Sequence, residues 1–257
     1  MKNLFLIIGV LIVLFSCKKS TDTTTSSGPI NTTTTPSYSL DAQGNPGGMY
    51  SGMFNVDYSY IYNSPPSIIY SSLFGVSCWF FTAPQSYQNI RTGNFYTTTT
   101  NSVIVNGHKF ALHNGIYQDS TGVTLSSPYQ WTIVGNSNIP SFTYTSITPK
   151  PSYSGFWQIP DTVNKQQNLT LPLSGASGYD LFEVDIYDTA TYNKHIKYSV
   201  SNATSVITIP KDSLTKFISG TGVIIETSLT KFDPQSTGGK KFLFQTTLEY
   251  QRTLTIK

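Results

Sequence analysis

A period of two in the apolar residues limits most strongly what this chain can fold into. In the segment 54–60, every second residue is Phe, Val or Tyr, and the residues between them are polar. The same alternation recurs at 169–173 and 182–187. It places successive side chains on opposite faces of a strand and does not match the period of a helix. The chain is also rich in aromatic residues (14%) and poor in charged ones (11%). This is typical of exported β-rich proteins, so an all-β fold is predicted.

Local signals add strands, a hairpin and one helix to this pattern. Asn106-Gly107 separates Val103–Val105 from His108–Leu112, and this dipeptide favours a type I′ turn because both turn positions need a positive φ. The more continuously apolar run Ser71–Thr82 predicts a central strand. A helix is expected only at Asp212–Ile218, with Asp212 as its N-cap. Turn signals at short intervals favour β-sandwiches.

A stiff break at Thr148-Pro149-Lys150-Pro151 is the best domain boundary. It predicts two β-sandwich domains in tandem, an N-terminal one over residues 40–147 and a C-terminal one over residues 151–257. The number and spacing of strands in the second domain resemble an immunoglobulin-like sandwich. The resemblance is one of pattern, because the Cys…Trp…Cys core of that fold is absent.

The N-terminus carries an apolar run, Leu4–Cys17, after the basic Lys2. The run is short for a membrane span, which needs roughly 20 apolar residues. It ends in Leu14-Phe15-Ser16-Cys17, the pattern of a bacterial lipoprotein signal, in which a small residue precedes the cysteine that is acylated. Residues 1–16 are therefore predicted to be a signal peptide, with an uncleaved helical anchor as the alternative. Residues 17–39 are expected to form a Ser/Thr-rich tether without a core of its own.

The residues around this cysteine carry a family resemblance. Cys17-Lys18-Lys19-Ser20, followed by Ser and Thr, resembles the start of many envelope lipoproteins of the Bacteroidota. The resemblance implies acyl chains such as palmitate on Cys17 and anchoring to the outer membrane, facing either the periplasm or the cell surface. More than one acyl chain makes such attachment stable.

The distribution of charge argues against nucleic-acid binding, and the cysteine content argues against a disulfide. The net charge is +3, with Lys and Arg scattered, so the basic stripe of a nucleic-acid-binding protein is missing. Cys78 has no partner once Cys17 is lipidated. It lies in step with Val76 and Phe80 and is predicted to be a buried structural thiol.

Two groups of residues invite a metal hypothesis. His108 and His113 would leave opposite faces of one continuous strand, because their numbers differ by an odd amount. A second, acidic group could supply oxygen ligands for calcium, but it lacks the glycine-containing loop of a dedicated site and is expected to be a solvated strand face. No metal and no cofactor are predicted. The acidic group consists of Asp180, Glu183, Asp185 and Asp188.

No arrangement typical of an enzyme stands out. The segment Gly75–Trp79 lacks the last glycine of a G-x-S-x-G elbow and falls inside a predicted strand. The prediction is a non-enzymatic binding or structural role, with a hydrolase whose active site is unrecognised as one alternative.

Aromatic residues near two loops supply another alternative, a glycan-binding lipoprotein of a polysaccharide-capture system. Tyr62 and Tyr70 flank the loop 63–66, and Tyr153 and Trp157 follow the interdomain break. These four form a candidate ligand platform for a glycan. Their competing interpretation is that they fill a sandwich core. Another envelope protein is the other partner considered.

Asp-Ser and Asp-Thr pairs resemble the O-glycosylation signal of exported Bacteroidota proteins. Such pairs also mark ordinary turns and helix caps. The candidate acceptors are Thr23, Ser120, Thr162, Thr189 and Ser213.

Overall fold

The computed structural model describes residues 39–41, 44–62, 71–119, 125–146, 149–188, 195–202 and 205–257. The predicted signal peptide and almost all of the predicted tether lie outside these ranges. Strands dominate the described residues, and the prediction of an all-β, sandwich-type fold is confirmed. The elements are β1 (Met49–Tyr62), β2 (Ser71–Ser86), α2 (Tyr87–Arg91), β3 (Thr97–Thr98), β4 (Ser102–Val105), β5 (His108–Lys109), β6 (Ala111–His113), β7 (Ile116–Gln118), β8 (Tyr129–Val134), β9 (Phe142–Ser146), β10 (Ser152–Tyr153), the 3-10 helix η2 (Ser154–Gln158), β11 (Thr162–Val163), β12 (Leu169–Pro172), β13 (Ala176–Ser177), β14 (Leu181–Asp188), β15 (His195–Ser201), β16 (Val206–Ile209), α3 (Lys211–Leu214), β17 (Gly222–Thr237) and β18 (Lys240–Ile256).

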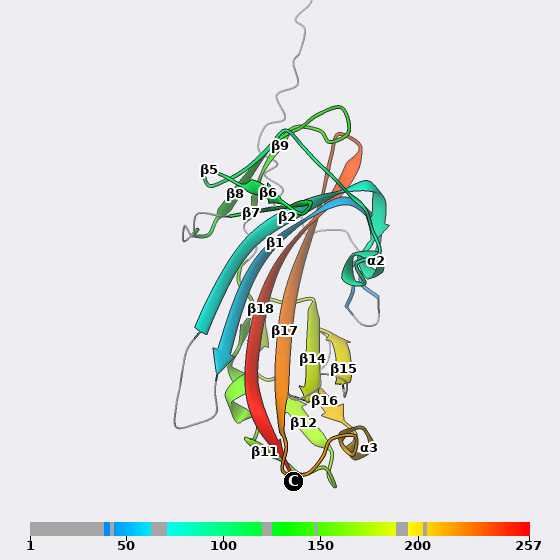
Figure 1. The fold of residues 1–257 in the computed structure, drawn as a ribbon, viewed down its shortest axis with the longest axis vertical. Helices are drawn as coiled ribbons and strands as arrows, with labels where there is room; N and C mark the ends of the chain where they lie inside the picture. Colours follow the sequence, from blue (N-terminus) through cyan, green and yellow to red (C-terminus); the bar gives the residue numbers. More distant parts are fainter. Residues whose placement is uncertain are drawn as a thin grey trace, which may run out of the picture.

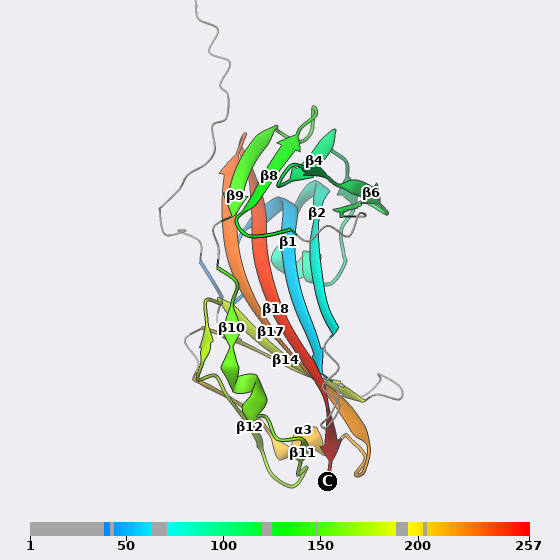
Figure 2. The same cartoon turned by 90° about the vertical axis from the view of Figure 1, so that its left-hand side faces the viewer.

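One long sheet organises the molecule. Its strands lie in the order β15-β14-β17-β18-β1-β2-β7-β6, and β1, β2, β17 and β18 run side by side over most of its length (Figure 1). A four-stranded sheet, β5-β4-β8-β9, and a two-stranded sheet, β12-β16, complete the main layers. Figure 2 shows β8 and β9 at one end of the long strands, with β10 and β12 toward the other.

The long sheet has two faces of different character. We call the face that carries Phe54 and Leu248 the capped face, because both smaller sheets pack on it. The opposite face carries Asp57 and Glu249, and we call it the polar face. The strand register assigns each residue to a face, since paired residues point to the same side.

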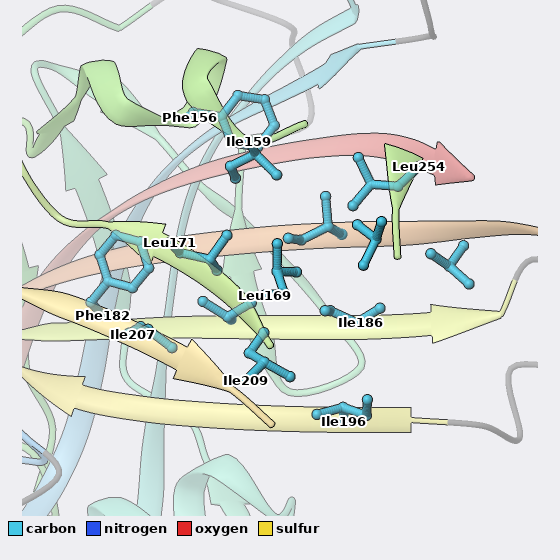
Figure 3. Close-up of a cluster of buried hydrophobic side chains, with 14 of the residues drawn as sticks. Phe156, Ile159, Leu169, Leu171, Phe182, Ile186, Ile196, Ile207, Ile209 and Leu254 are labelled. Carbon is cyan, nitrogen blue, oxygen red and sulfur yellow. The ribbon is translucent and has the colours of Figure 1, made fainter. Parts of the chain in front are cut away.

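Two of the three hydrophobic cores lie on the capped face. In the first, Phe54 of β1 and Phe244 of β18 pack against Trp131 of the four-stranded sheet. In the second, shown in Figure 3, β12, β16 and η2 cover β14, β17 and the end of β18. Its labelled side chains are Phe156, Ile159, Leu169, Leu171, Phe182, Ile186, Ile196, Ile207, Ile209 and Leu254.

The third core lies on the polar face, where the short helix α2 covers one end of the sheet. Tyr87 and Ile90 of α2 pack in a cluster with Phe232 of β17 and Leu243 of β18. The Ser86 hydroxyl caps α2 by accepting a hydrogen bond from the Asn89 backbone N–H at 3.2 Å. This helix was not predicted. The rest of the polar face carries mostly polar side chains.

The long sheet crosses the predicted domain boundary, and here the structure differs from two sandwiches in tandem. β1, from the first predicted domain, pairs in parallel with β18, from the second, from Gly52↔Phe242 to Tyr62↔Arg252. We call this pairing the seam. It is the one strand pairing, among the described residues, that joins residues before 147 to residues after 148. The Pro-rich break is a local signal and carries no information about such a distant pairing.

The hairpin prediction is confirmed, whereas two local predictions are wrong. Asn106 (φ 49°) and Gly107 (φ 83°) both have the positive φ of a type I′ turn between β4 and β5. The run His108–Leu112 is not one strand, however, because it breaks at the buried Phe110 into β5 and β6, which belong to different sheets. The C-terminal helix is only α3, and Pro210, not Asp212, is its N-cap.

Candidate functional site

A group of aromatic rings lies on the capped face toward the C-terminal ends of β1 and β18, where the two strands meet η2. β1 contributes three tyrosines at every second position, so that all three point to this face. β18 contributes Tyr250, the register partner of Tyr60. We call the whole group the aromatic strip. Its members are Tyr58, Tyr60, Tyr62, Phe156, Trp157 and Tyr250.

The rings of the aromatic strip pack on one another. Tyr250 stacks on Tyr60 with ring centroids 5.4 Å apart and on Phe156 at 5.0 Å. Trp157 meets Tyr62 edge to face at 4.5 Å. Such pairs contribute roughly 0.5–1.5 kcal/mol each beyond the area they bury, so they hold the rings in fixed orientations. Trp157 is nevertheless 55% exposed, which makes its indole the accessible end of the strip.

Lys150 lies beside the other end of the strip. Its Nζ is 4.5 Å from the ring centroids of both Tyr58 and Tyr60, and it donates a hydrogen bond to the Tyr60 hydroxyl. A lysine in this position gains cation–π attraction from two rings. Lys150, which belongs to the predicted interdomain break, is thereby held on β1.

The structure brings together two of the four residues predicted as a ligand platform. Trp157 and Tyr62 are in contact, but Tyr62 is only 8% exposed. Tyr153 is 2% exposed and packs against Phe182, so its place in the platform is wrong. The pKa of Tyr153 is raised to about 12 by burial and then by Tyr179, and its hydroxyl donates to the Pro172 carbonyl. Tyr70 lies outside the described residues.

A row of carboxylates crosses the polar face. Glu183 and Asp185 on β14 share this face, as predicted, and Asp185 is the register partner of Glu226 on β17. Glu249 on β18 and Asp57 on β1 continue the row across the next two strands. All five side chains are half-buried, so the expected solvated strand face is an incomplete description. We call these five residues the carboxylate row.

Basic side chains gather at the β14 end of this row. The Arg91 guanidinium of α2 lies 2.6 Å from the Glu183 carboxylate, and Lys197 of β15 lies 3.4 Å from it. His195 pairs with Asp185. Arg91 therefore ties α2 to the long sheet.

The other two members of the acidic group are buried away from the row. Asp180 is 3% exposed and accepts hydrogen bonds from Lys231 Nζ at 2.7 Å and from the Phe232 N–H at 2.9 Å. Asp188 is 9% exposed. The expectation of a solvated face is wrong for these two, because the sequence could not show which elements cover them.

The two metal hypotheses find no supporting geometry in the described part of the chain. No group of three or more His, Cys, Asp or Glu side chains is positioned there to hold a metal ion. His108 and His113 are both exposed and lie in different sheets, so the parity argument assumed a continuous strand that does not exist.

Cys78 is fully buried, as predicted, and burial raises the pKa of its thiol. Thr162 lies in β11 and is half-buried, and Ser213 lies in α3 with its hydroxyl 3.3 Å from the Tyr198 hydroxyl. Glycosylation of either stays a prediction. Cys17, Thr23, Ser120 and Thr189 lie outside the described residues.

Sequence reasoning missed Tyr58, Tyr60 and Tyr250 as members of the aromatic strip. The alternation in β1 could have placed Tyr58, Tyr60 and Tyr62 on one face, but nothing local pairs β1 with β18.

The described ranges contain no helix with the length and apolar character needed to cross a membrane. No family model matches the chain, and no curated protein matches it.

Proposed function

We propose that this chain is a lipid-anchored protein of a bacterial cell envelope with a non-enzymatic binding or structural role. The single observation that carries the proposal is the apolar run Leu4–Cys17 with its lipobox-like end. Acyl chains on Cys17 would contribute about 0.8 kcal/mol for each methylene group buried in the bilayer, and two or more chains would make the attachment stable. Lys18 and Lys19 would add attraction to anionic headgroups.

Replacing the acylated cysteine tests this anchoring. In a Gram-negative host, the wild-type chain should sediment with membranes and be released by detergent but not by high salt. Cys17→Ser should move most of the protein to the soluble fraction, because it removes the acyl acceptor. Cys78→Ala is the matched control, since it changes the other cysteine of the chain and should leave the protein in membranes. Sedimentation of Cys17→Ser with salt-washed membranes would contradict the proposal.

The second candidate function is glycan binding at the aromatic strip, and the exposed Trp157 favours it. An aromatic face is electron-rich and attracts the weakly positive C–H groups on the flat side of a sugar ring. Ring packing against Tyr62 presents the indole in a fixed orientation, and at the other end of the strip the Tyr60 hydroxyl and the Lys150 ammonium could hydrogen-bond to hydroxyls of an extended glycan. Rigid aromatic groups lose little entropy on binding.

Affinity electrophoresis of the detergent-solubilised full chain in gels containing soluble glucans, mannans or xylans tests this candidate. At least one polysaccharide should retard the wild type. Trp157→Ala should raise the dissociation constant obtained from that retardation at least tenfold, which corresponds to about 1.4 kcal/mol. Tyr96→Ala is the control, because Tyr96 is 83% exposed and is not part of the strip. Equal retardation of wild type and Trp157→Ala would exclude the strip as the binding surface.

A further inference from the structure

The seam between β1 and β18 carries acidic side chains from both strands on the polar face. Asp57 of β1 is paired with Thr247, and Glu249 of β18 is paired with Ser59. The two carboxylates are thus diagonal neighbours on adjacent strands. Glu226 of β17 is in turn a diagonal neighbour of Glu249 on its other side. Three carboxylates therefore follow one another across three adjacent strands.

The charged and titratable groups that neighbour these three carboxylates come from three elements. β14 contributes Glu183, Asp185 and Tyr187, β15 contributes His195 and Lys197, and α2 contributes Arg91. β2, the other neighbour of β1, has no charged residue between Ser71 and Ser86. Arg91 and Lys197 form their ion pairs with Glu183, and His195 contacts Asp185, all at the end of the row far from β1. The arrangement leaves the seam with less positive charge than the β14 end.

Neutral donors are the partners of Asp57. The Asn55 amide donates to its carboxylate, and the Thr247 hydroxyl also hydrogen-bonds to it. The Gln245 amide donates in turn to Asn55 at 2.7 Å. These groups hold the carboxylate in place without supplying a full positive charge, so a neighbouring carboxylate has a larger effect on it.

Burial and like charge raise the proton affinity of the row. Burial, and then the charge of Glu249, raise the pKa of Asp57 to about 7, against a smaller lowering by the Thr247 hydrogen bond. Burial also raises the pKa of Glu249, with Ser59 and Lys197 acting against it and Glu183 adding to it. The pKa of Glu226 is raised by burial and by Glu249 and Asp185.

We propose that Asp57 and Glu249 make the seam a pH-sensitive junction, which is tight while Asp57 is protonated and weakened when both carboxylates are ionised. Because the seam is, within the described ranges, the strand pairing that joins the two halves of the chain, its weakening would loosen one half from the other. The device is independent of lipid anchoring and of glycan binding.

The sign of the pH dependence follows from linkage. A carboxyl whose pKa is higher in the folded than in the unfolded state binds more protons when folded. Its contribution to stability is therefore complete in acid and is lost as pH rises through its folded pKa, which for Asp57 is about 7. The free energy of unfolding should fall from about pH 5 to about pH 8.

The test is the thermal midpoint of the detergent-solubilised full chain between about pH 5 and pH 8.5. We expect the wild-type midpoint to fall by roughly 5 °C across this range. Asp57→Asn should raise the midpoint at the alkaline end and at least halve the fall. Glu249→Gln removes the neighbouring charge and so lowers the pKa of Asp57, and the fall should therefore be smaller and end at a lower pH. Asp212→Asn, at an exposed position in α3, is the matched control and should behave as wild type.

Hydrogen exchange, corrected for the intrinsic effect of pH, locates the change. Backbone amides of β1 and β18 should lose protection at alkaline pH to a larger extent than amides of β8, and Asp57→Asn should restore it. The proposal is overturned by a flat wild-type profile or by Asp57→Asn and Glu249→Gln profiles with the wild-type slope. A loss of protection that spares β1 and β18 overturns it as well.

Discussion

Residues 40–147, expressed without the rest of the chain, are expected not to fold. This fragment loses β18, so β1 becomes an edge strand with its whole seam unpaired. It also loses five side chains that are buried in its two cores, each contributing about 1.5–3 kcal/mol, or roughly 10 kcal/mol together. That is as large as the entire stability of a typical domain. The missing side chains are Leu181, Phe232, Phe242, Leu243 and Phe244.

Residues 149–257 are expected to behave differently. The core that covers β14 and β17 draws its buried side chains from this fragment, with Tyr62 as the one contribution from the other half among the described residues. The fragment should therefore unfold cooperatively, although at a lower temperature than the full chain. Near-ultraviolet circular dichroism and thermal unfolding of both fragments check the pair of expectations. Cooperative unfolding of residues 40–147 alone would show instead two independent domains, as the Pro-rich break suggests.

The second large effect is expected at Phe54, where β1 meets the four-stranded sheet. The ring is completely buried and stacks on Phe244 at 4.3 Å, with edge contacts to Phe80 at 5.6 Å and Trp131 at 5.1 Å. It thus joins β1, both its neighbours in the sheet and the covering layer. Phe54→Ala would leave a cavity among ring systems that cannot all move inward, and such substitutions cost about 3–5 kcal/mol.

The thermal midpoint measures this effect. For a chain of this size, the cost corresponds to a fall of roughly 10 °C. Tyr96→Ala removes an aromatic ring that is 83% exposed and should change the stability by about 0.5 kcal/mol or less. If the midpoint of Phe54→Ala stays within about 2 °C of wild type, Phe54 does not have the packing described above.

Sequence patterns predicted the strands well where one face of a strand is buried. The alternation at 169–173 predicted β12, and that at 182–187 predicted β14. The Asn106-Gly107 turn was predictable because its positive φ values depend on those two residues alone. The missed helix α2 has a cap in Ser86, but it is too short to show a helical period.

The arrangement of the strands could not be predicted from the same patterns. The seam joins residues about 190 positions apart, and alternation does not specify which strand becomes the neighbour of which. For the same reason, the carboxylates of β1, β17 and β18 gave no sign of lying in one row. Burial of Tyr153 was equally hidden, because it depends on packing against Phe182 in another strand.

Acyl chains on Cys17 are proposed to hold this protein in the cell envelope. Mass spectrometry of the N-terminal peptide, from protein purified out of bacterial membranes, tests this proposal most directly. We expect a mature chain that begins at Cys17 and carries a thioether-linked diacylglyceryl group on that cysteine. An N-terminal peptide that retains residues 1–16 and carries an unmodified Cys17 would contradict it.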